Sequence, residues 1–180
     1  MTVLIIDGHP DLTRSTANAL ILSSMQQDKG CCISHLSESA WIVEQEQQAL
    51  LNASLIVIQF PLYWSAFPAV LKQWVDEVFT YGFAFGPNGS QLKNKPIILS
   101  ITAGAKADSY REGGFNFMPF SDYLQALMHP FKAAEMTILE PIISFEMNAN
   151  PDEGGNRFTC QALATAHTQQ LQAAIAAVTM

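Results

Sequence analysis

The stretch from Leu55 to Phe79, LIVIQFPLYWSAFPAVLKQWVDEVF, limits the possible folds of this chain more than any other segment. It opens with an apolar run, residues 55–60, that lacks polar alternation, which is typical of a strand buried on both faces. After a short aromatic loop, apolar side chains recur at helical spacing, and Pro68 suits a first helical turn. The apolar positions are Phe67, Val70, Leu71, Trp74, Val75 and Val78. A doubly buried strand that leads into a core-facing helix favours an α/β fold.

The rest of the chain repeats this alternation of strands and helices. Strands are predicted at residues 3–6, 31–36, 55–60, 96–101 and 137–145. Helices are predicted to end near residue 29 and to span about 44–52, 68–79, 121–135 and 156–178, with Pro130 accommodated by a kink. The alternation predicts one domain over residues 1–180, a flavodoxin-like three-layer α/β sandwich with a five-stranded parallel sheet in the order 2-1-3-4-5.

Composition excludes several classes of protein. The chain is 49% hydrophobic and 14% charged, as compact globular chains are, and its net charge of -7 with 9 Lys and Arg disfavours binding to nucleic acid. It shows no basic leader and no apolar run of membrane-spanning length, so we expect a cytoplasmic protein. The spacing of its three cysteines fits neither a disulfide framework nor a zinc site, and the scattered histidines predict no metal site.

Three loops follow strands one, three and four, at the edge where open parallel sheets bind ligands. The first, residues 9–18, carries hydroxyls at the start of a helix, where N–H groups and the helix dipole favour a phosphate. The second, residues 61–65, carries Tyr63 and Trp64, and the third begins with small residues that allow a planar ring to approach the backbone. A phosphate site beside a flat aromatic site is the pattern that a flavin needs.

Each of these features also has a plain structural interpretation. Ser15 or Thr16 could simply cap the helix, and the aromatic pair could belong to the core. The chain has neither a G-x-G-x-x-G nor a Walker motif, which disfavours a nucleoside triphosphate and a standard dinucleotide-fold cofactor. The convergence of all three loops on one edge favours the binding site.

The chain also resembles a known family in these same loops. The residues that carry the resemblance are HP followed by Ser15 and Asn18, the block PLYWSAFPAVLKQWVDEVFTYGFAFG, and SITAG with Tyr110 beyond it. They look like the flavodoxin-like NAD(P)H quinone oxidoreductases, which include DT-diaphorase, the drug-activity modulator and general stress proteins, and the ancillary flavoproteins of potassium-efflux systems. The resemblance implies a homodimer that binds FAD, or FMN in some members, and uses NAD(P)H.

The resemblance also assigns roles to individual residues. It implies that the phosphates lie at His9, Ser15, Ala17 and Asn18, and that the isoalloxazine ring lies at Pro61, Leu62, Tyr63, Trp64 and Ser65. It places the pyrimidine end of the ring at Thr102, Ala103, Gly104 and Ala105. Tyr110 matches the family's active-site tyrosine, and the loop from Tyr81 to Gly86 is expected to help close the site and the dimer.

Two residues differ from the family pattern. Ala105 stands where a second glycine is common, and its Cβ disfavours a positive φ. Asn116 stands where many quinone reductases have a histidine, and an amide can form hydrogen bonds but cannot exchange a proton near neutral pH.

The resemblance implies a two-electron, ping-pong reduction of a quinone or a similar planar acceptor, with Tyr110 as hydrogen-bond donor and Asn116 assisting. One alternative is a regulatory flavoprotein subunit that binds the cytosolic face of a potassium-efflux transporter. Another is a one-electron carrier like flavodoxin, which is weaker because the central aromatic block matches the reductases.

Overall fold

The computed structural model describes residues 2–38 and 40–179, and it contains one parallel sheet in the order β2-β1-β3-β4-β5, with β6 also paired to β4. The strands are β1 Val3–Asp7, β2 Cys31–His35, β3 Leu55–Pro61, β4 Pro96–Thr102, β5 Thr137–Ile138 and β6 Ile142–Ser144. The helices are α1 Ala17–Met25, α2 Val43–Asn52, α3 Ala69–Val78, α4 Phe120–Ala133 and α5 Arg157–Thr179, with short 3-10 turns at Leu12–Arg14, Ala107–Ser109 and Pro151–Glu153. The predicted flavodoxin-like order is confirmed.

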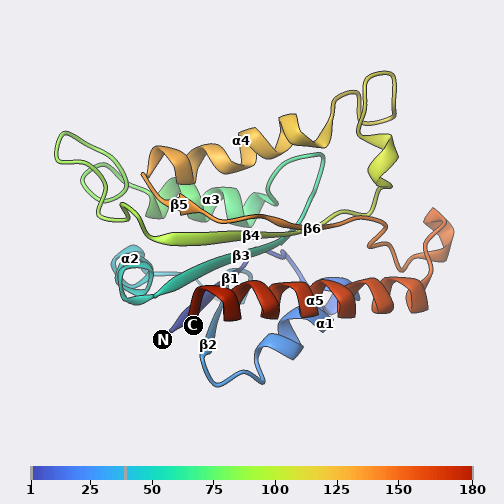
Figure 1. Ribbon diagram of the computed structural model, residues 1–180, viewed down its shortest axis with the longest axis horizontal. Helices are drawn as coiled ribbons and strands as arrows, with labels where there is room; N and C mark the ends of the chain where they lie inside the picture. Colours follow the sequence, from blue (N-terminus) through green and yellow to red (C-terminus); the bar gives the residue numbers. More distant parts are fainter. Residues whose placement is uncertain (1, 39, 180) are drawn as a thin grey trace.

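The sheet is covered on both faces, as the uninterrupted apolar strands predict. Figure 1 shows α3 and α4 on one side of the sheet and α1 and α5 on the other. Alternate residues of β3 serve the two layers: Ile56 and Ile58 pack in the α3 and α4 core, whereas Leu55 and Val57 pack in the α1 and α5 core. At the carboxyl end of β3 this second face continues with a polar residue, Gln59, which is completely buried.

The expected fifth strand is broken into two pieces. Residues 137–138 pair with the start of β4, and residues 142–144 pair with its end. Pro141 lies between the two pieces, and proline has no N–H to donate to a strand ladder. The sheet therefore has a sixth short strand at this edge.

Two helix ends also differ from the prediction. The first helix ends at Met25 rather than near residue 29, because the next residues form a turn in which the N–H of Gly30 donates to the Asp28 carboxylate. The fourth helix continues past Pro130 and ends at Ala133.

The loop from Tyr81 to Gly86 does not help to close the predicted site within this chain. It precedes β4 and lies at the amino end of the sheet, whereas the candidate site loops lie at the carboxyl end (Figure 1). Phe83 is buried in the core, and Tyr81 and Phe85 line a separate cavity of about 540 Å³ between α3 and α4. The expectation that this loop helps to close the site and the dimer stays a prediction about the dimer.

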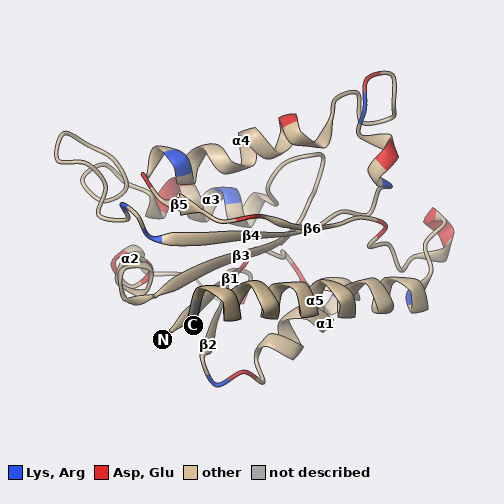
Figure 2. Cartoon of the chain, viewed as in Figure 1, with Lys and Arg blue, Asp and Glu red and all other residues tan. Residues whose placement is uncertain are grey.

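Charged residues are sparse along the chain. Figure 2 shows Lys and Arg in separate short segments on different elements. Among the described residues, no helix is both long enough and apolar enough to cross a membrane.

Candidate functional site

A cavity of about 1290 Å³ opens at the carboxyl end of the sheet and joins the three predicted loops. It is larger than the roughly 300–1,000 Å³ of an ordinary small-molecule site, so it has room for a cofactor together with a second planar molecule. The predicted residues that line it are His9, Ser15, Ala17, Asn18, Pro61, Leu62, Tyr63, Trp64, Ser65, Thr102, Gly104, Ala105, Tyr110 and Asn116.

Ala103 is the predicted residue that does not line the cavity. It is buried, and both of its backbone groups are used elsewhere, because its N–H donates to Ser144 O and its carbonyl accepts from Met147 N–H. Ala105 does line the cavity and does not have a positive φ, so its Cβ causes no backbone strain.

His9 presents a ring N–H at one end of the cavity. Its Nδ1 accepts a hydrogen bond from the Asp11 N–H at 3.0 Å, so the ring proton is on Nε2. Burial lowers the pKa of His9, against the opposing influence of Asp7 and Asp11. The Nε2 atom lies 3.5 Å from the Tyr63 hydroxyl, too long for a strong hydrogen bond, and is therefore available to an acceptor in the cavity.

The start of α1 supplies further donors beside His9. The Ser15 hydroxyl accepts from the Asn18 N–H at 3.0 Å, which confirms that it caps the helix and leaves its own proton free to donate. The backbone N–H groups of Thr16 and Ala17 form no hydrogen bond within residues 2–38 and 40–179. Arg14 adds a positive charge to the cavity wall. Together these groups suit an anion such as a phosphate.

The aromatic loop is a tight turn rather than part of the core. Tyr63 and Ala66 exchange two backbone hydrogen bonds, of 3.2 Å and 3.0 Å, and the residues between them have φ values of 50° at Trp64 and 58° at Ser65. Positive φ at both central positions is the signature of a type I′ turn, which Asn-Gly usually occupies. The Trp64 side chain is 98% exposed at the cavity, so this indole is not a core residue.

Tyr110 lines the cavity from a different loop, the one that follows β4. Its ring packs against Phe120, Tyr123 and Phe145, with centroid distances of 5.2, 6.1 and 5.6 Å. Burial is the main cause that raises the pKa of the Tyr110 hydroxyl, which keeps it protonated at neutral pH. The hydroxyl forms no hydrogen bond within the described part of the chain, so it can donate to a ligand.

Asn116 is held in place by its neighbours. Its Nδ2 donates to Ser109 Oγ at 2.7 Å, and its backbone carbonyl accepts from the Tyr123 hydroxyl at 2.6 Å. One amide proton is therefore already used within the loop, which favours a supporting role for Asn116 over direct proton exchange.

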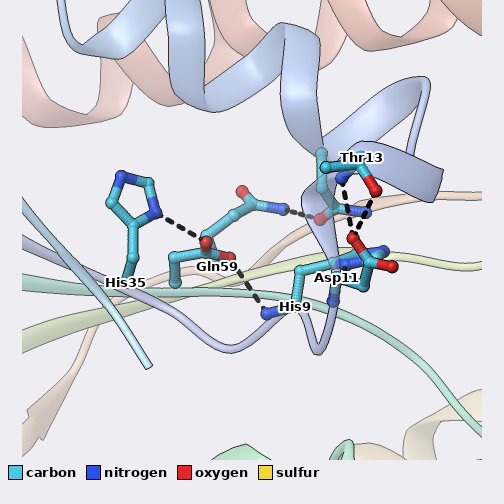
Figure 3. A network of polar contacts seen from close by, with 7 residues as sticks. His9, Asp11, Thr13, His35 and Gln59 are labelled. Carbon is cyan, nitrogen blue, oxygen red and sulfur yellow. Dashed lines mark hydrogen bonds and ion pairs between the residues drawn. The ribbon is translucent and has the colours of Figure 1, made fainter. Parts of the chain in front are cut away.

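A buried carboxylate fixes the backbone of the first loop. Asp7 is completely buried, accepts from the His9 N–H at 2.9 Å and lies 2.8 Å from His35 Nδ1. Figure 3 shows the labelled members of this group, with His35 on β2 and His9 and Asp11 on the loop after β1. Burial raises the pKa of the Asp7 carboxyl, and the contacts with His35 and His9 oppose that shift.

Buried amides and hydroxyls support the part of the cavity wall that Asn18 and Thr102 form. Asn18 Nδ2 donates to Thr102 Oγ1 at 3.0 Å, and Gln59 Nε2 donates to Asn18 Oδ1 at 2.8 Å. These three residues come from α1, β4 and β3, so the bonds tie the helix of the phosphate-like site to the two strands beneath the ring site.

Sequence reasoning missed a group of cavity residues. They are Arg14, Phe115, Phe117, Tyr123, Met147, Asn148, Ala149, Asn150, Glu153 and Cys160. Arg14 could have been found, because it lies inside the first candidate loop. Residues 147–153 could not, because they follow the last predicted strand without a motif that marks a binding site.

Comparison with known proteins agrees with this architecture. A family model described as flavodoxin-like fold matches residues 1–169. The chain is 35% identical to the uncharacterized NAD(P)H oxidoreductase YdeQ of Bacillus subtilis, over 88% of this chain and 84% of that protein. It is 32% identical to the glutathione-regulated potassium-efflux system ancillary protein KefG of Yersinia pestis, over 94% of this chain and 93% of that protein.

Two solved structures have a similar fold over almost their whole length. An NADPH-quinone reductase from P. pentosaceus has a TM-score of 0.76 and 27% identity, covering 94% of this chain and 97% of that one. General stress protein 14 from Treponema denticola, in complex with FMN, has a TM-score of 0.82 and 28% identity, covering 96% of this chain and 99% of that one.

Proposed function

We propose a function from one premise: this chain belongs to the flavodoxin-like family of NAD(P)H quinone reductases, whose fold model matches residues 1–169. It is accordingly an oxidoreductase of the NAD(P)H-dependent, quinone-reductase type. The finer proposal is a flavin-dependent NAD(P)H:quinone oxidoreductase that transfers two electrons by a ping-pong mechanism.

The observation that carries the proposal is the arrangement of the large cavity. The cavity joins the donors of His9, Thr16 and Ala17 to the exposed Trp64 and to the Tyr110 hydroxyl, which forms no hydrogen bond within the described part of the chain. This donor set fits a ligand with a phosphate at one end and a flat ring at the other. FAD is the candidate that the resemblance implies, and FMN is supported by the complex of the Treponema relative.

When bound, a flavin supplies hydride acceptance and donation. The chain's own residues bind and orient it. His9, Ser15 and the start of α1 would hold its phosphate, and the backbone at Gly104 and Ala105 would contact its ring. Tyr63 and Trp64 would give the ring a stacking surface, and Phe115 and Phe117, which also line the cavity, would shield it from water.

Tyr110 is the proposed hydrogen-bond donor to negative charge that develops during the reaction. Its protonated hydroxyl faces the cavity without another partner, so it needs no rearrangement to donate. Asn116 positions this loop through Ser109 and offers its second amide proton. We propose that NAD(P)H and the quinone use the same space in turn, which would give the ping-pong order.

The purified protein provides a direct test. We expect a flavin absorption spectrum, released FAD or FMN on denaturation, and turnover of NADH or NADPH with a soluble quinone. A protein that neither retains nor binds a flavin contradicts the proposal. Flavin binding with a stable semiquinone in a redox titration and no quinone turnover favours the one-electron carrier instead.

A second candidate function is suggested by the similarity to KefG over 94% of this chain. In it the protein is a regulatory subunit on the cytosolic face of a potassium-efflux transporter. Retained flavin with poor turnover and co-purification with a membrane transporter favour that function, whereas vigorous quinone turnover without transporter affinity counts against it.

Three further parts of the proposal concern the assembly. We propose a homodimer that uses α3 and the loop from Tyr81 to Gly86. We propose a single domain, because one sheet carries every described strand. The cytoplasm is the proposed location, and the three free cysteines are typical of a reducing compartment.

A further inference from the structure

A line of polar side chains continues from the cavity wall into the protein, on the face of the sheet that α1 and α5 cover. Ser100 and Gln59 are register partners on β4 and β3, and both are completely buried. His167 of α5 is completely buried behind them. The surrounding cluster consists of hydrophobic residues, and no side-chain N or O atom buried in the described chain lacks a hydrogen bond. Buried groups of this kind cost stability unless they are fully paired.

The single hydroxyl proton of Ser100 determines which ring nitrogen of His167 is protonated. The Ser100 hydroxyl donates to Gln59 Oε1 at 2.6 Å, and this uses its single proton. Ser100 Oγ also lies 2.7 Å from His167 Nε2, so in that contact the oxygen accepts and Nε2 carries the proton. Burial lowers the pKa of His167 to about 4, so Nδ1 has no proton at neutral pH. Nδ1 therefore accepts from the Ser144 hydroxyl at 2.8 Å.

The hydrogen bonds between Gln59 and the cavity run in the same donor-to-acceptor direction. Gln59 Nε2 donates to Asn18 Oδ1 at 2.8 Å, and Asn18 Nδ2 donates to Thr102 Oγ1 at 3.0 Å. Thr102 Oγ1 has thus accepted a bond and retains its own proton. The acceptor available for that proton inside the chain is Asn18 Oδ1 at 3.4 Å, which is longer than a good O–H···O bond. The chain of donors ends on a hydroxyl at the cavity wall.

We infer that His167 is a positioning residue for the flavin site: its Nε2–H donates to Ser100 Oγ and holds that hydroxyl in place at the start of a one-directional chain of hydrogen bonds through Gln59 and Asn18, which leaves the Thr102 hydroxyl as a donor to the ligand. This inference deepens the proposed function and rests on it. It specifies the ligand atom beside Thr102 as an acceptor, such as a ring carbonyl oxygen or an unprotonated ring nitrogen.

A double-mutant cycle tests whether His167 acts through Thr102. The measurement is the dissociation constant of FMN and of FAD for the apoprotein, from the quenching of flavin fluorescence. Thr102→Val and His167→Phe are each expected to weaken binding about tenfold, the value of one good hydrogen bond. The double variant is expected to bind within about twofold of either single variant, because both changes remove the same bond.

Polar variants of His167 show whether the histidine acts through its hydrogen bond to Ser100 or only through packing. His167→Gln places an amide N–H near the position of Nε2 and is expected to restore most of the affinity. His167→Asn reaches only toward Ser144 and is expected to bind as weakly as the Phe variant. Thr168→Val is the matched control, because Thr168 is buried next to His167 and its hydroxyl donates only to Ala164 O within its own helix. It is expected to leave flavin affinity unchanged.

The outcomes separate this inference from the proposed function. The role of His167 is overturned if the losses of flavin affinity in the two single variants add in the double variant. It is also overturned if His167→Phe binds flavin normally. In both cases the proposed function stands. An unmodified chain that binds no flavin overturns both. If the Phe variant does not fold, Ser100→Ala combined with Thr102→Val gives the same cycle with a smaller change, and additive losses there overturn the inference equally.

Discussion

At the scale of single residues, the protonation states of two imidazoles organise the candidate site. His9 keeps its proton on Nε2 because Nδ1 accepts the Asp11 N–H, and His167 keeps its proton on Nε2 because Ser100 has no proton left to give it. One imidazole therefore presents a donor to the cavity, and the other presents a donor to the chain of hydrogen bonds that ends at Thr102 on the cavity wall.

Removing one hydroxyl tests the proposed reaction. Tyr110→Phe is expected to lower quinone turnover at least tenfold with unchanged flavin content, because a donor to developing charge is lost. Steady-state kinetics and the flavin-to-protein ratio measure this. Tyr81→Phe is the control, since Tyr81 lies outside the large cavity and is 70% exposed. An unchanged turnover for the Tyr110 variant removes that residue from the mechanism.

The buried histidine also predicts how stability depends on pH. The pKa of His167 is 6.5 as the reference value and about 4 in the folded chain, so between these values the unfolded chain binds a proton that the folded chain does not. Stability is therefore lost as the pH falls from about 6.5 to about 4, by on the order of 3 kcal/mol for this residue. His9, with a lowered pKa, contributes in the same direction.

Urea unfolding at a series of pH values, with the chain and its His167→Gln variant side by side, isolates this contribution. The variant is expected to lose less stability over the acidic range than the unmodified chain. Equal losses in the two proteins would mean that His167 binds its proton as readily in the folded chain as in the unfolded one.

The amino-acid sequence predicted only part of the candidate site. The loops with His9, Tyr63 and Tyr110 could be predicted, because each follows a recognisable strand. The link from Thr102 to His167 could not, since it joins residues far apart in the sequence and depends on the register of β3 and β4. A histidine in a long helix gives no signal of where its ring nitrogens point.

At the scale of elements, the turn at Trp64 and Ser65 is a place where the chain departs from its preferred local geometry. Both residues have positive φ, a region that glycine and asparagine tolerate better. Strain of this kind persists where the surrounding structure holds it, and here the result is an indole projected into solvent at the cavity.

Replacing the turn by the sequence that its geometry favours is expected to separate stability from binding. Trp64→Asn with Ser65→Gly should raise the free energy of unfolding by about 1–2 kcal/mol and weaken flavin binding through the loss of the stacking surface. Denaturant unfolding and a flavin titration measure the two effects. Asn94→Gly, at a φ of 62° and outside the cavity, is the control and should leave binding unchanged. Tighter flavin binding in the turn variant would contradict the role of Trp64.

The strands were predicted more accurately than the break within the fifth strand. The apolar runs identified every buried strand to within a residue or two, because strands covered on both faces have little choice of side chain. The break at Pro141 was missed, because the flanking residues keep the pattern of a strand on each side. Beyond that break the chain continues into residues 147–153, which lie along the cavity.

At the scale of the whole molecule, the separate cavity of about 540 Å³ is the clearest candidate for a contact between subunits. Tyr81 and Phe85 line it with their rings 6.0 Å apart, and they are 70% and 51% exposed. Neighbouring exposed aromatic side chains are typical of surfaces that another protein covers.

The oligomeric state tests this assignment. Sedimentation of the unmodified protein is expected to show a dimer, and the double variant Tyr81→Glu and Phe85→Glu is expected to show a monomer, because two charges would have to be buried in the interface. Phe158→Glu is the control, since Phe158 is 82% exposed at the start of α5, away from this cavity. A monomeric unmodified protein, or a double variant that remains a dimer, would contradict the assignment.

The order of the five predicted strands is confirmed, because right-handed crossovers leave few ways to order parallel strands, whereas the sixth short strand was not predicted. The electron acceptor was not, since the cavity walls define a shape and a donor pattern that several planar molecules satisfy.

The exposed indole at the rim of the cavity gives the protein an internal optical reporter. Trp74 is fully buried, and the indole N–H groups of Trp41 and Trp74 both donate to glutamates. Trp64 is instead surrounded by water, so its emission should lie at the red edge of the spectrum and should be quenched when a flat chromophore stacks on it. Occupancy of the site can then be followed by light alone, in the unmodified chain and without a coupled assay.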